Sequence, residues 1–373
     1  MTTDVATEAL TVLGDDAASL GVAGRLALDG HDVTVWLPPS SREASALLCE
    51  RPRLRLVEEG GEAAVTLSAV TNDSFAALAA SDLLVTCAPL NAQAVLNDLL
   101  LPLVEPRHTL MLLPGGLCTL AHAKWLKDRG RGAAGLPTLV ESDTAPLIAH
   151  MLAPDVVHVT ATVTGPGFGV FPACRTVETM PMLERLFAGA HAHPHVLSAA
   201  LGELTPVVRT PALFMNAAAA QRRCAESSVL RGGFTPVVAH LAAAIDAERL
   251  AVAEALGIVL PAAAEALHLR GLGPRGDLWS TVNGSFALTR TPDEMSTVGR
   301  PVDDGVVMLR TWADLADQLC VAARASRALV TLHELATGLV SSTARSLADL
   351  GIGGMNEAAL AHFLNTGSDG PTS

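Results

Sequence analysis

The first half of the chain alternates short apolar runs with helical segments, and this alternation constrains the fold more than any other feature. The runs Leu10–Leu13, Val33–Leu37, Leu83–Ala88 and Thr109–Leu113 are almost uninterrupted, and glycine or proline follows each of them. Strands have this pattern when helices cover both faces of a parallel sheet. We therefore predict a Rossmann-like, doubly wound α/β domain over residues 1–200.

A helical pattern replaces the strands from about Pro206. Its periodicity predicts helices at Pro211–Glu226, Thr235–Leu256, Ala262–Leu269, Val306–Ala323 and Ser326–Ser341. These segments predict an all-α C-terminal domain over residues 201–366, followed by a disordered tail over residues 367–373. Asp246 and Arg249 lie three residues apart in one of these helices, a spacing that predicts an ion pair on the helix surface.

Composition narrows the classes of partner. Half of the residues are apolar, which is enough to form a core, and 25 basic against 38 acidic side chains give a net charge of −13. That balance argues against nucleic acid or an anionic membrane as a partner. No run has the 18 or so apolar residues of a spanning helix, and the start lacks the basic and apolar regions of a signal peptide. We expect a cytoplasmic protein, and the apolar faces of its helices are compatible with a homodimer.

Metal and hydrolase chemistry lack a local signature. His191, His193 and His195 alternate, so an extended chain would place them on one side. No acid or cysteine stands next to them in the sequence, and they fall in the predicted linker, so we expect no metal site. The six cysteines form no C-x-x-C pair, and no G-x-S-x-G elbow occurs.

Several motifs occur in a characteristic order. They are the turn at Gly14 with Gly30-His31 after the next helix, Leu113-Pro114-Gly115-Gly116, Glu141-Ser142-Asp143-Thr144, Asp246-Ala247-Glu248-Arg249, and Arg300-Pro301-Val302-Asp303-Asp304. In this order and spacing the chain resembles the octopine/nopaline (opine) dehydrogenase family over about residues 9–365. The resemblance implies a nicotinamide cofactor, reduction of the imine formed from an amino acid and a 2-oxo acid, and catalysis in the cleft between a Rossmann domain and a helical domain.

The phosphate loop departs from the G-x-G-x-x-G pattern of that family. Gly14 keeps the first glycine, but Asp16 and Ser19 stand at the second and third. The second glycine lets the pyrophosphate approach the start of a helix. A carboxylate there adds bulk and a like charge, which costs about 1 kcal/mol at ~4 Å in water and more in a partly buried site. Aspartate is also a favoured helix cap, and both effects can hold together, so nicotinamide binding is in doubt.

The second strand ends without the acid that would hold a ribose 2′-hydroxyl. Ser40, Ser41 and Arg42 could instead receive a 2′-phosphate, which favours NADP over NAD if a cofactor binds. An ordinary polar turn is the alternative. Pro89, which follows a buried strand, is grouped with the predicted cofactor-binding residues.

The catalytic histidine implied by the resemblance is not found at its expected position. The family carries an Asn-x-x-x-His motif early in the helical domain, whereas here Asn216 is followed by Ala220 at the histidine position. Alanine cannot transfer a proton. His240, about one helix turn after Thr235, is the candidate replacement as acid or base, and a packed or surface histidine is the alternative.

The remaining candidates are polar residues beside predicted element ends. Asp143 follows a strand end, where it could hold a substrate ammonium, orient a histidine, or cap the next segment. The resemblance groups Glu141, Thr144 and Asn216 with the substrate. Arg300, together with Asp303 and Asp304, could recognise a carboxylate, and a solvated turn is the alternative.

Two functions follow from these features. The first is an NAD(P)H-dependent reductase of the opine type that tolerates a variant loop and uses another acid. The second is a redox-silent scaffold that performs cofactor-free imine formation, cyclisation or elimination, or that only binds a ligand. The family resemblance favours the first, while Asp16 and Ala220 favour the second. A role in specialised metabolism would suit either.

Overall fold

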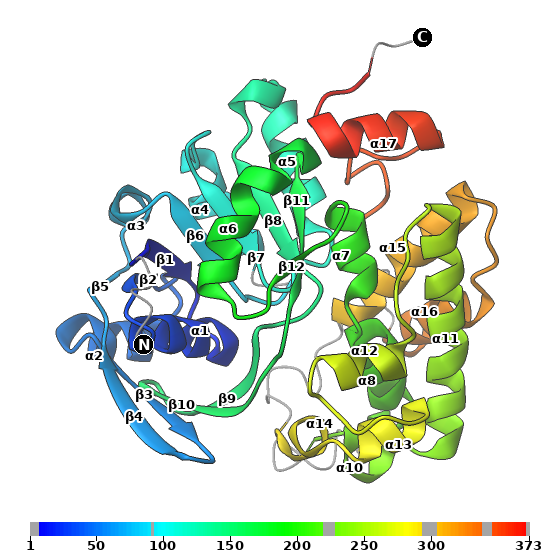
Figure 1. The fold of residues 1–373 in the computed structure, drawn as a ribbon, viewed down its shortest axis with the longest axis horizontal. Helices are drawn as coiled ribbons and strands as arrows, with labels where there is room; N and C mark the ends of the chain where they lie inside the picture. The colour runs from blue at the N-terminus through cyan, green and yellow to red at the C-terminus, as the bar shows by residue number, and fades with distance from the viewer. Residues whose placement is uncertain (1–6, 91–92, 219–227, 293–303, 338–344, 371–373) are drawn as a thin grey trace. The chain divides into compact units, whose positions relative to one another are not determined.

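The computed structural model describes residues 7–90, 93–218, 228–292, 304–337 and 345–370 (Figure 1). The chain forms two compact units. Unit 1 comprises Met1–Val196 together with His362–Ser373, and unit 2 comprises Leu197–Ala361. Unit 1 has α/β structure and unit 2 is helical, so the predicted fold class is confirmed.

An eight-stranded sheet forms the centre of unit 1. Its strand order is β12-β11-β8-β7-β6-β1-β2-β5. In chain order these strands are β1 (Ala9–Leu13), β2 (Asp32–Trp36), β5 (Ala69–Thr71), β6 (Leu83–Thr86), β7 (Thr109–Leu112), β8 (Thr138–Ser142), β11 (Gly167–Phe171) and β12 (His191–Ala192). The strands from β8 to β5 pair in parallel, as the apolar runs predict, whereas β11 pairs antiparallel with β8. The sheet is therefore mixed.

A second, four-stranded sheet in unit 1 was not predicted. Its order is β4-β3-β10-β9, from β3 (Arg53–Glu58), β4 (Gly61–Thr66), β9 (Leu147–Ala153) and β10 (Val156–Thr162). Helix α1 (Ala17–Leu28) contacts this sheet on one side and β2 on the other. A Cβ at Gly21 would lie 3.0 Å from Leu147, and one at Gly24 would lie 2.9 Å from Leu56. These two glycines therefore set the close approach of the second sheet.

Short helices connect the strands of unit 1. They are α1, α2 (Arg42–Glu50), α3 (Ser74–Ala80), α4 (Gln93–Leu99), α5 (Cys118–Asp128) and α6 (Thr176–Leu186), with 3-10 turns η1 (Leu101–Leu103), η2 (Ala133–Gly135) and η3 (Ala173–Arg175). Helix α1 begins where predicted, after Gly14, whose φ of +139° is a conformation that glycine adopts readily. This turn brings the start of α1 to the carboxyl end of β1.

Helices alone make up the described part of unit 2. They are α7 (Val196–Gly202), α8 (Thr205–Met215), α10 (Leu230–Gly233), α11 (Pro236–Ala255), α12 (Ala263–Leu269), α13 (Leu278–Asn283), α14 (Phe286–Arg290), α15 (Asp304–Gln318), α16 (Arg324–Thr337) and α17 (Glu357–Thr366). Val196 and the end of α17 belong to unit 1. Helix α8 begins at Thr205 rather than at Pro211, with Pro206 in its first turn, where a missing N–H costs no helix hydrogen bond.

The predicted surface pair of Asp246 and Arg249 is formed, but it is buried. Arg249 is 2% exposed, and its Nε donates to Asp246 Oδ1 at 2.8 Å. Its other nitrogens donate to the carbonyls of Leu201 and Pro261, while Asp246 accepts from the amide of Ala263. The pair thus connects three segments of unit 2, which the three-residue spacing alone cannot indicate.

The C-terminal segment returns to unit 1, although the sequence pattern assigns it to the helical domain and to a disordered tail. Phe363 packs on Phe171 with a ring-centroid distance of 5.3 Å, and Lys127 pairs with Asp369 at 2.7 Å. Gly367 adopts a positive φ beside Pro172. Residues 371–373 lie outside the described part of the chain.

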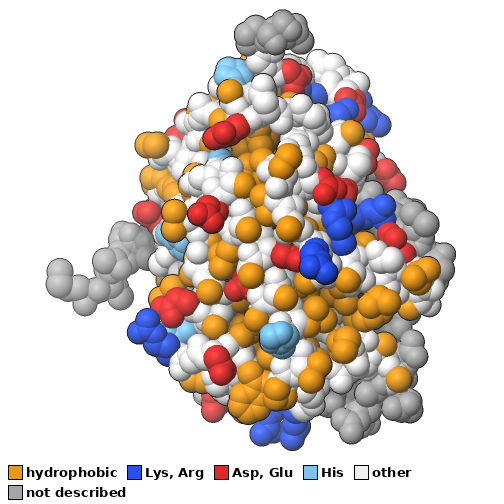
Figure 2. Space-filling model, turned by 90° about the vertical axis from the view of Figure 1, so that its right-hand side faces the viewer, with side chains coloured by type: hydrophobic (Ala, Val, Ile, Leu, Met, Phe, Trp, Pro, Cys, Tyr) orange, Lys and Arg blue, Asp and Glu red, His pale blue; other side chains and the backbone are white. Residues whose placement is uncertain are grey.

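Large apolar side chains are exposed on unit 2. Val237, Leu269, Phe286 and Leu335 lie on helices, and Val259 lies in the loop between α11 and α12. On the face drawn in Figure 2, apolar side chains are interspersed with acidic and basic ones. Within the described residues, no helix combines the length and apolar character needed to cross a membrane.

Candidate functional site

Side chains of the first turn cap the start of α1. Asp16 is the N-cap: its Oδ1 accepts from the amide of Ser19 at 2.9 Å, and its Oδ2 accepts from the Ser19 hydroxyl at 2.6 Å. The Ser19 hydroxyl also accepts from the amide of Cys87, just after β6, at 3.1 Å. An amide that a pyrophosphate would otherwise use is therefore already paired with a carboxylate.

Burial changes the electrostatics of this turn. It raises the pKa of the Asp16 carboxyl above its ordinary value, and the neighbouring Asp15 adds to that rise, while the hydrogen bonds from Ser19 oppose it. Burial, with Asp16 nearby, also raises the pKa of the Cys87 thiol. The Cys87 thiol therefore stays neutral. At the position where a phosphate would bind, this turn carries the carboxyl group of Asp16 and no basic side chain.

The predicted nucleotide-binding residues beyond this turn are placed as follows. Ser41 is buried, and its hydroxyl donates to Asp15 Oδ2 at 2.5 Å, whereas Ser40 is exposed. Arg42 is the first residue of α2, and its side chain lies outside the described part of the structure. Pro89 is partly buried in the segment after β6. The Ser41 bond to Asp15 ties the end of β2 to the loop before α1.

Glu141 accepts hydrogen bonds from residues at the start of α5. Its side chain is fully buried, with Oε1 accepting from the amide of Leu117 at 2.6 Å and Oε2 accepting from the Thr119 hydroxyl at 2.7 Å. A Cβ at Gly115 would lie 2.5 Å from Glu141 Cγ, so the loop requires glycine there. These contacts give Glu141 a helix-capping role.

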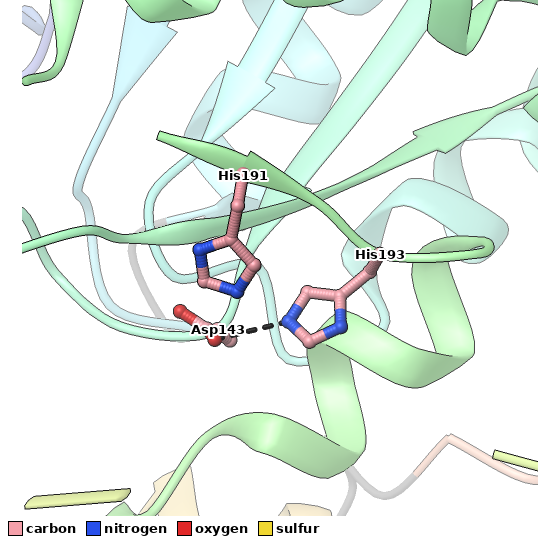
Figure 3. Close-up of side chains that lie close together, drawn as sticks. All are labelled: Asp143, His191 and His193. Atoms are coloured by element: carbon pink, nitrogen blue, oxygen red, sulfur yellow. Dashed lines mark hydrogen bonds and ion pairs between the residues drawn. The ribbon is translucent and has the colours of Figure 1, made fainter. Parts of the chain in front are cut away.

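Asp143, two residues further on, lies beside two histidines that come much later in the chain. The registers Phe168↔Ser142 and Gly167↔His191 place β11 between the end of β8 and β12. Asp143 Oδ2 lies 3.0 Å from His193 Nε2, and Asp143 Oδ1 accepts from the amide of Gly167 at 2.9 Å. Figure 3 shows the rings of His191 and His193 turned toward this carboxylate. Of the roles predicted for Asp143, the contact with a histidine is the one observed.

The acid missing from the sequence neighbourhood of the histidines is therefore supplied by tertiary structure. One ligand atom each from Asp143, His191 and His193 lies within 4.8 Å of the others. His195 is not part of this group; burial, with His193 nearby, lowers the pKa of its imidazole to about 4. Thr144, the other predicted residue here, is partly buried and donates to the carbonyl of Ala145.

The predicted residues of unit 2 are dispersed. Asn216 ends α8, and its Nδ2 donates to the carbonyls of Ala212 and Gly233, which is a structural contact. His240 is exposed on α11, and Asp304 begins α15. Ala220, Arg300 and Asp303 lie outside the described residues.

Sequence reasoning missed Glu203, a buried carboxyl before α8. Its Oε1 accepts from the amide of Thr205 at 2.8 Å. Burial raises the pKa of Glu203 to about 7, with Asp304 adding to the rise while Thr205 and Arg270 oppose it. The sequence around Glu203 gives no signal of this environment, because Arg270 and Asp304 come from two distant segments.

Comparison with known proteins relates both units to one fold. Residues 192–337 match the family described as NAD/NADP octopine/nopaline dehydrogenase, alpha-helical domain. An octopine dehydrogenase solved with NADH and L-arginine is 16% identical, with a TM-score of 0.71, over 97% of this chain and 98% of that one. A yersinopine dehydrogenase with NADP+ bound is 15% identical, with a TM-score of 0.68, over 96% and 98%.

A more distant likeness includes 2-dehydropantoate 2-reductase from Methylococcus capsulatus, which is 17% identical, with a TM-score of 0.58, over 91% of this chain and 99% of that one. At such identities the likeness establishes a shared fold. The chain matches no curated protein sequence. The resemblance indicated by the motifs is confirmed.

Proposed function

We propose that this chain is an NAD(P)H-dependent oxidoreductase that acts on amino-acid-related substrates. The premise is that it belongs to the octopine/nopaline dehydrogenase family, whose helical domain it matches. The observation that carries the proposal is the family match over residues 192–337, joined to a Rossmann-like sheet. The solved relatives hold NADH with L-arginine in one case and NADP+ in another.

The proposed reaction joins an amine to a carbonyl. The amino group of an amino acid condenses with a 2-oxo acid and releases water. The imine then takes a hydride, which the reduced nicotinamide supplies when bound, and one proton, giving a secondary amine. The protein must therefore bind two carboxylates and deliver the proton to the imine nitrogen, since the hydride adds to the imine carbon.

The nucleotide turn fits this cofactor only in part. The strand, the turn at Gly14 and the start of α1 have the arrangement that a dinucleotide needs. The Asp16 carboxylate occupies the helix start and repels a pyrophosphate, so binding is expected to be weak. The end of β2 carries no acid of its own, and Ser40 and Arg42 there support a preference for NADP over NAD, whereas the Ser41 hydroxyl is already paired with Asp15.

His240 is proposed as the proton donor. It is exposed on a helix of the family-matched segment, and histidine is the side chain that enzymes use most often for proton transfer. Arg300, with Asp303 and Asp304 near it in the sequence, is proposed to bind a substrate carboxylate through its guanidinium group. We expect His240→Gln to lower kcat about 100-fold or more, whereas Glu254→Gln, an exposed change on the same helix, leaves it unaltered.

The experiment that tests the function is a direct titration of the protein with NADPH and NADH, followed by fluorescence. Binding of either, together with oxidation of the reduced cofactor in the presence of an amino acid and a 2-oxo acid, would support the proposal. Tighter binding of NADPH would support the 2′-phosphate assignment. No binding at millimolar cofactor would contradict the reductase and favour cofactor-free chemistry.

Assembly and location are separate proposals. The exposed apolar side chains of unit 2 support a homodimer, which light scattering after size-exclusion chromatography would test. A cytoplasmic location and a role in specialised metabolism remain expectations from the sequence.

A further inference from the structure

We propose that Asp143, His191 and His193 together bind one divalent transition-metal ion, with zinc the ion that their donor atoms fit best. Two imidazole nitrogens and one carboxylate oxygen are a common ligand set for zinc. Three protein ligands leave a fourth position open to water or to a small molecule, as in zinc sites that take part in chemistry.

The three side chains are close to the spacing that such a site requires. Ligand atoms at ~2.1 Å from a tetrahedral zinc lie about 3.4 Å from one another. Asp143 Oδ2 and His193 Nε2 are 3.0 Å apart, and an atom of His191 lies within 4.8 Å of both. His191 is exposed, so its ring can turn by the small amount needed without disturbing the core. An ion would then replace the hydrogen bond between His193 and Asp143.

Backbone contacts hold the two inner ligands in place. The amide and carbonyl of Gly167 bond to Asp143 Oδ1 and to the Asp143 amide, each at 2.9 Å. The amide of His193 donates to the carbonyl of Phe168 at 2.7 Å. The carboxylate and the His193 ring are therefore positioned by three paired strands, which lowers the cost of assembling a metal site.

The glycine at position 167 makes the convergence sterically possible. A Cβ built there would lie 2.4 Å from His193 Nε2 and 2.6 Å from Asp143 Oδ2. The two ligand atoms thus occupy the space that any other side chain would fill. His195, which continues the alternation in the sequence, is excluded from the group, so the site is defined by tertiary contacts rather than by the histidine repeat.

The test is a zinc titration of tag-free protein that has been freed of metal with EDTA. Isothermal calorimetry or competition with a zinc dye should show one ion per chain, and cobalt should give the visible bands of a tetrahedral complex. Loss of a ligand should weaken zinc binding on the order of 100-fold or more. We expect this of His191→Ala and of Asp143→Asn, and the His191 variant should keep its melting temperature in EDTA because that residue is exposed.

Two other histidines provide matched controls. His195→Gln alters the third histidine of the repeat, and His150→Gln alters a separate pair in which the rings of His150 and His158 lie 4.7 Å apart. Both variants should bind zinc as the wild type does. Failure of the wild type to bind micromolar zinc, unchanged binding by His191→Ala, or loss of binding in His150→Gln would each overturn the proposal. Because zinc alone is titrated, these outcomes are independent of nicotinamide binding.

Discussion

At the scale of single residues, three carboxylates of unit 1 accept hydrogen bonds from backbone amides, but they have different roles. Asp16 and Glu141 accept bonds from residues at the starts of α1 and α5, so each stabilises a helix. Asp143 accepts from Gly167 and leaves its second oxygen beside His193. Only Asp143 therefore directs an oxygen toward a group of other possible ligands.

The Asp16 carboxylate is predicted to limit nicotinamide binding. Asp16→Asn keeps a helix cap but removes the charge, and Asp16→Gly removes both charge and bulk. We expect both variants to bind NADPH more tightly than the wild type, by about tenfold, since one like-charge contact costs about 1 kcal/mol or more. Fluorescence titration would measure this, with Asp32→Asn, an exposed change on β2, as the control for net charge. Equal affinities throughout would show that Asp16 does not face the phosphates.

Glu203 is predicted to make stability depend on pH. Its pKa is about 7 in the folded chain against 4.5 as the ordinary value, so the folded state holds a proton that the unfolded state has lost between these values. Its contribution is fully present below about pH 4.5 and declines as the pH rises to about 7, by on the order of 3 kcal/mol. Glu203→Gln should therefore stabilise the protein relative to the wild type more at pH 8 than at pH 5.

Urea unfolding at the two pH values would measure the Glu203 effect. Glu254→Gln, an exposed change on α11, provides the control and should show the same stability difference at both pH values. An equal difference for Glu203→Gln at pH 5 and pH 8 would mean that the carboxyl ionises as freely in the folded chain as in the unfolded one.

At the scale of elements, side-chain spacing predicted which residues of one segment lie close together. It did not predict which other segments pack around them. The alternation of His191 and His193 put both rings near one side, and the antiparallel strand β11 then connected them to β8. The spacing of Asp246 and Arg249 predicted their pairing. The pair is buried because α11 packs against α8, and Arg249 also bonds to a carbonyl of α7 and to one in the segment before α12. Burial, rather than spacing, decides how much such a pair matters.

The buried pair is predicted to be essential for unit 2. Asp246→Ala leaves Arg249 without its charge partner in a site from which water is excluded, and we expect a loss of about 3 kcal/mol or more in the free energy of unfolding. Chemical denaturation would measure it. Glu254→Ala, on the exposed side of the same helix, should change stability by less than about 0.5 kcal/mol. Similar values for the two variants would refute a structural role for the pair.

At the scale of the whole molecule, the chain enters unit 2 after Val196 and returns to unit 1 at His362. The returning residues bury Phe363 against Phe171, with Lys127 over the Phe363 ring at 4.7 Å. Unit 1 is therefore completed by residues that are far apart in the sequence, and a cut placed at the end of the helical pattern would divide it.

Deletion of residues 362–373 is predicted to destabilise unit 1. Removing a buried phenylalanine typically costs about 3–5 kcal/mol, and the deletion also removes the ion pair of Lys127 with Asp369. Calorimetry should show a lower melting temperature for the truncated chain. Deletion of residues 371–373 alone, beyond these contacts, should leave the melting temperature unaltered, and equal behaviour of the two truncations would contradict the prediction.

The sequence by itself determined the fold class of each unit and the resemblance to the octopine/nopaline dehydrogenase family. Apolar period and turn residues are local properties, so the strands β1, β2, β6 and β7 and the start of α1 could be predicted from them, as could the departure at Asp16. The four-stranded sheet, the burial of Arg249, the environment of Glu203 and the convergence of Asp143 with His191 and His193 depended on tertiary structure. Each arises from strand register or packing between distant segments, which no local pattern of residues encodes.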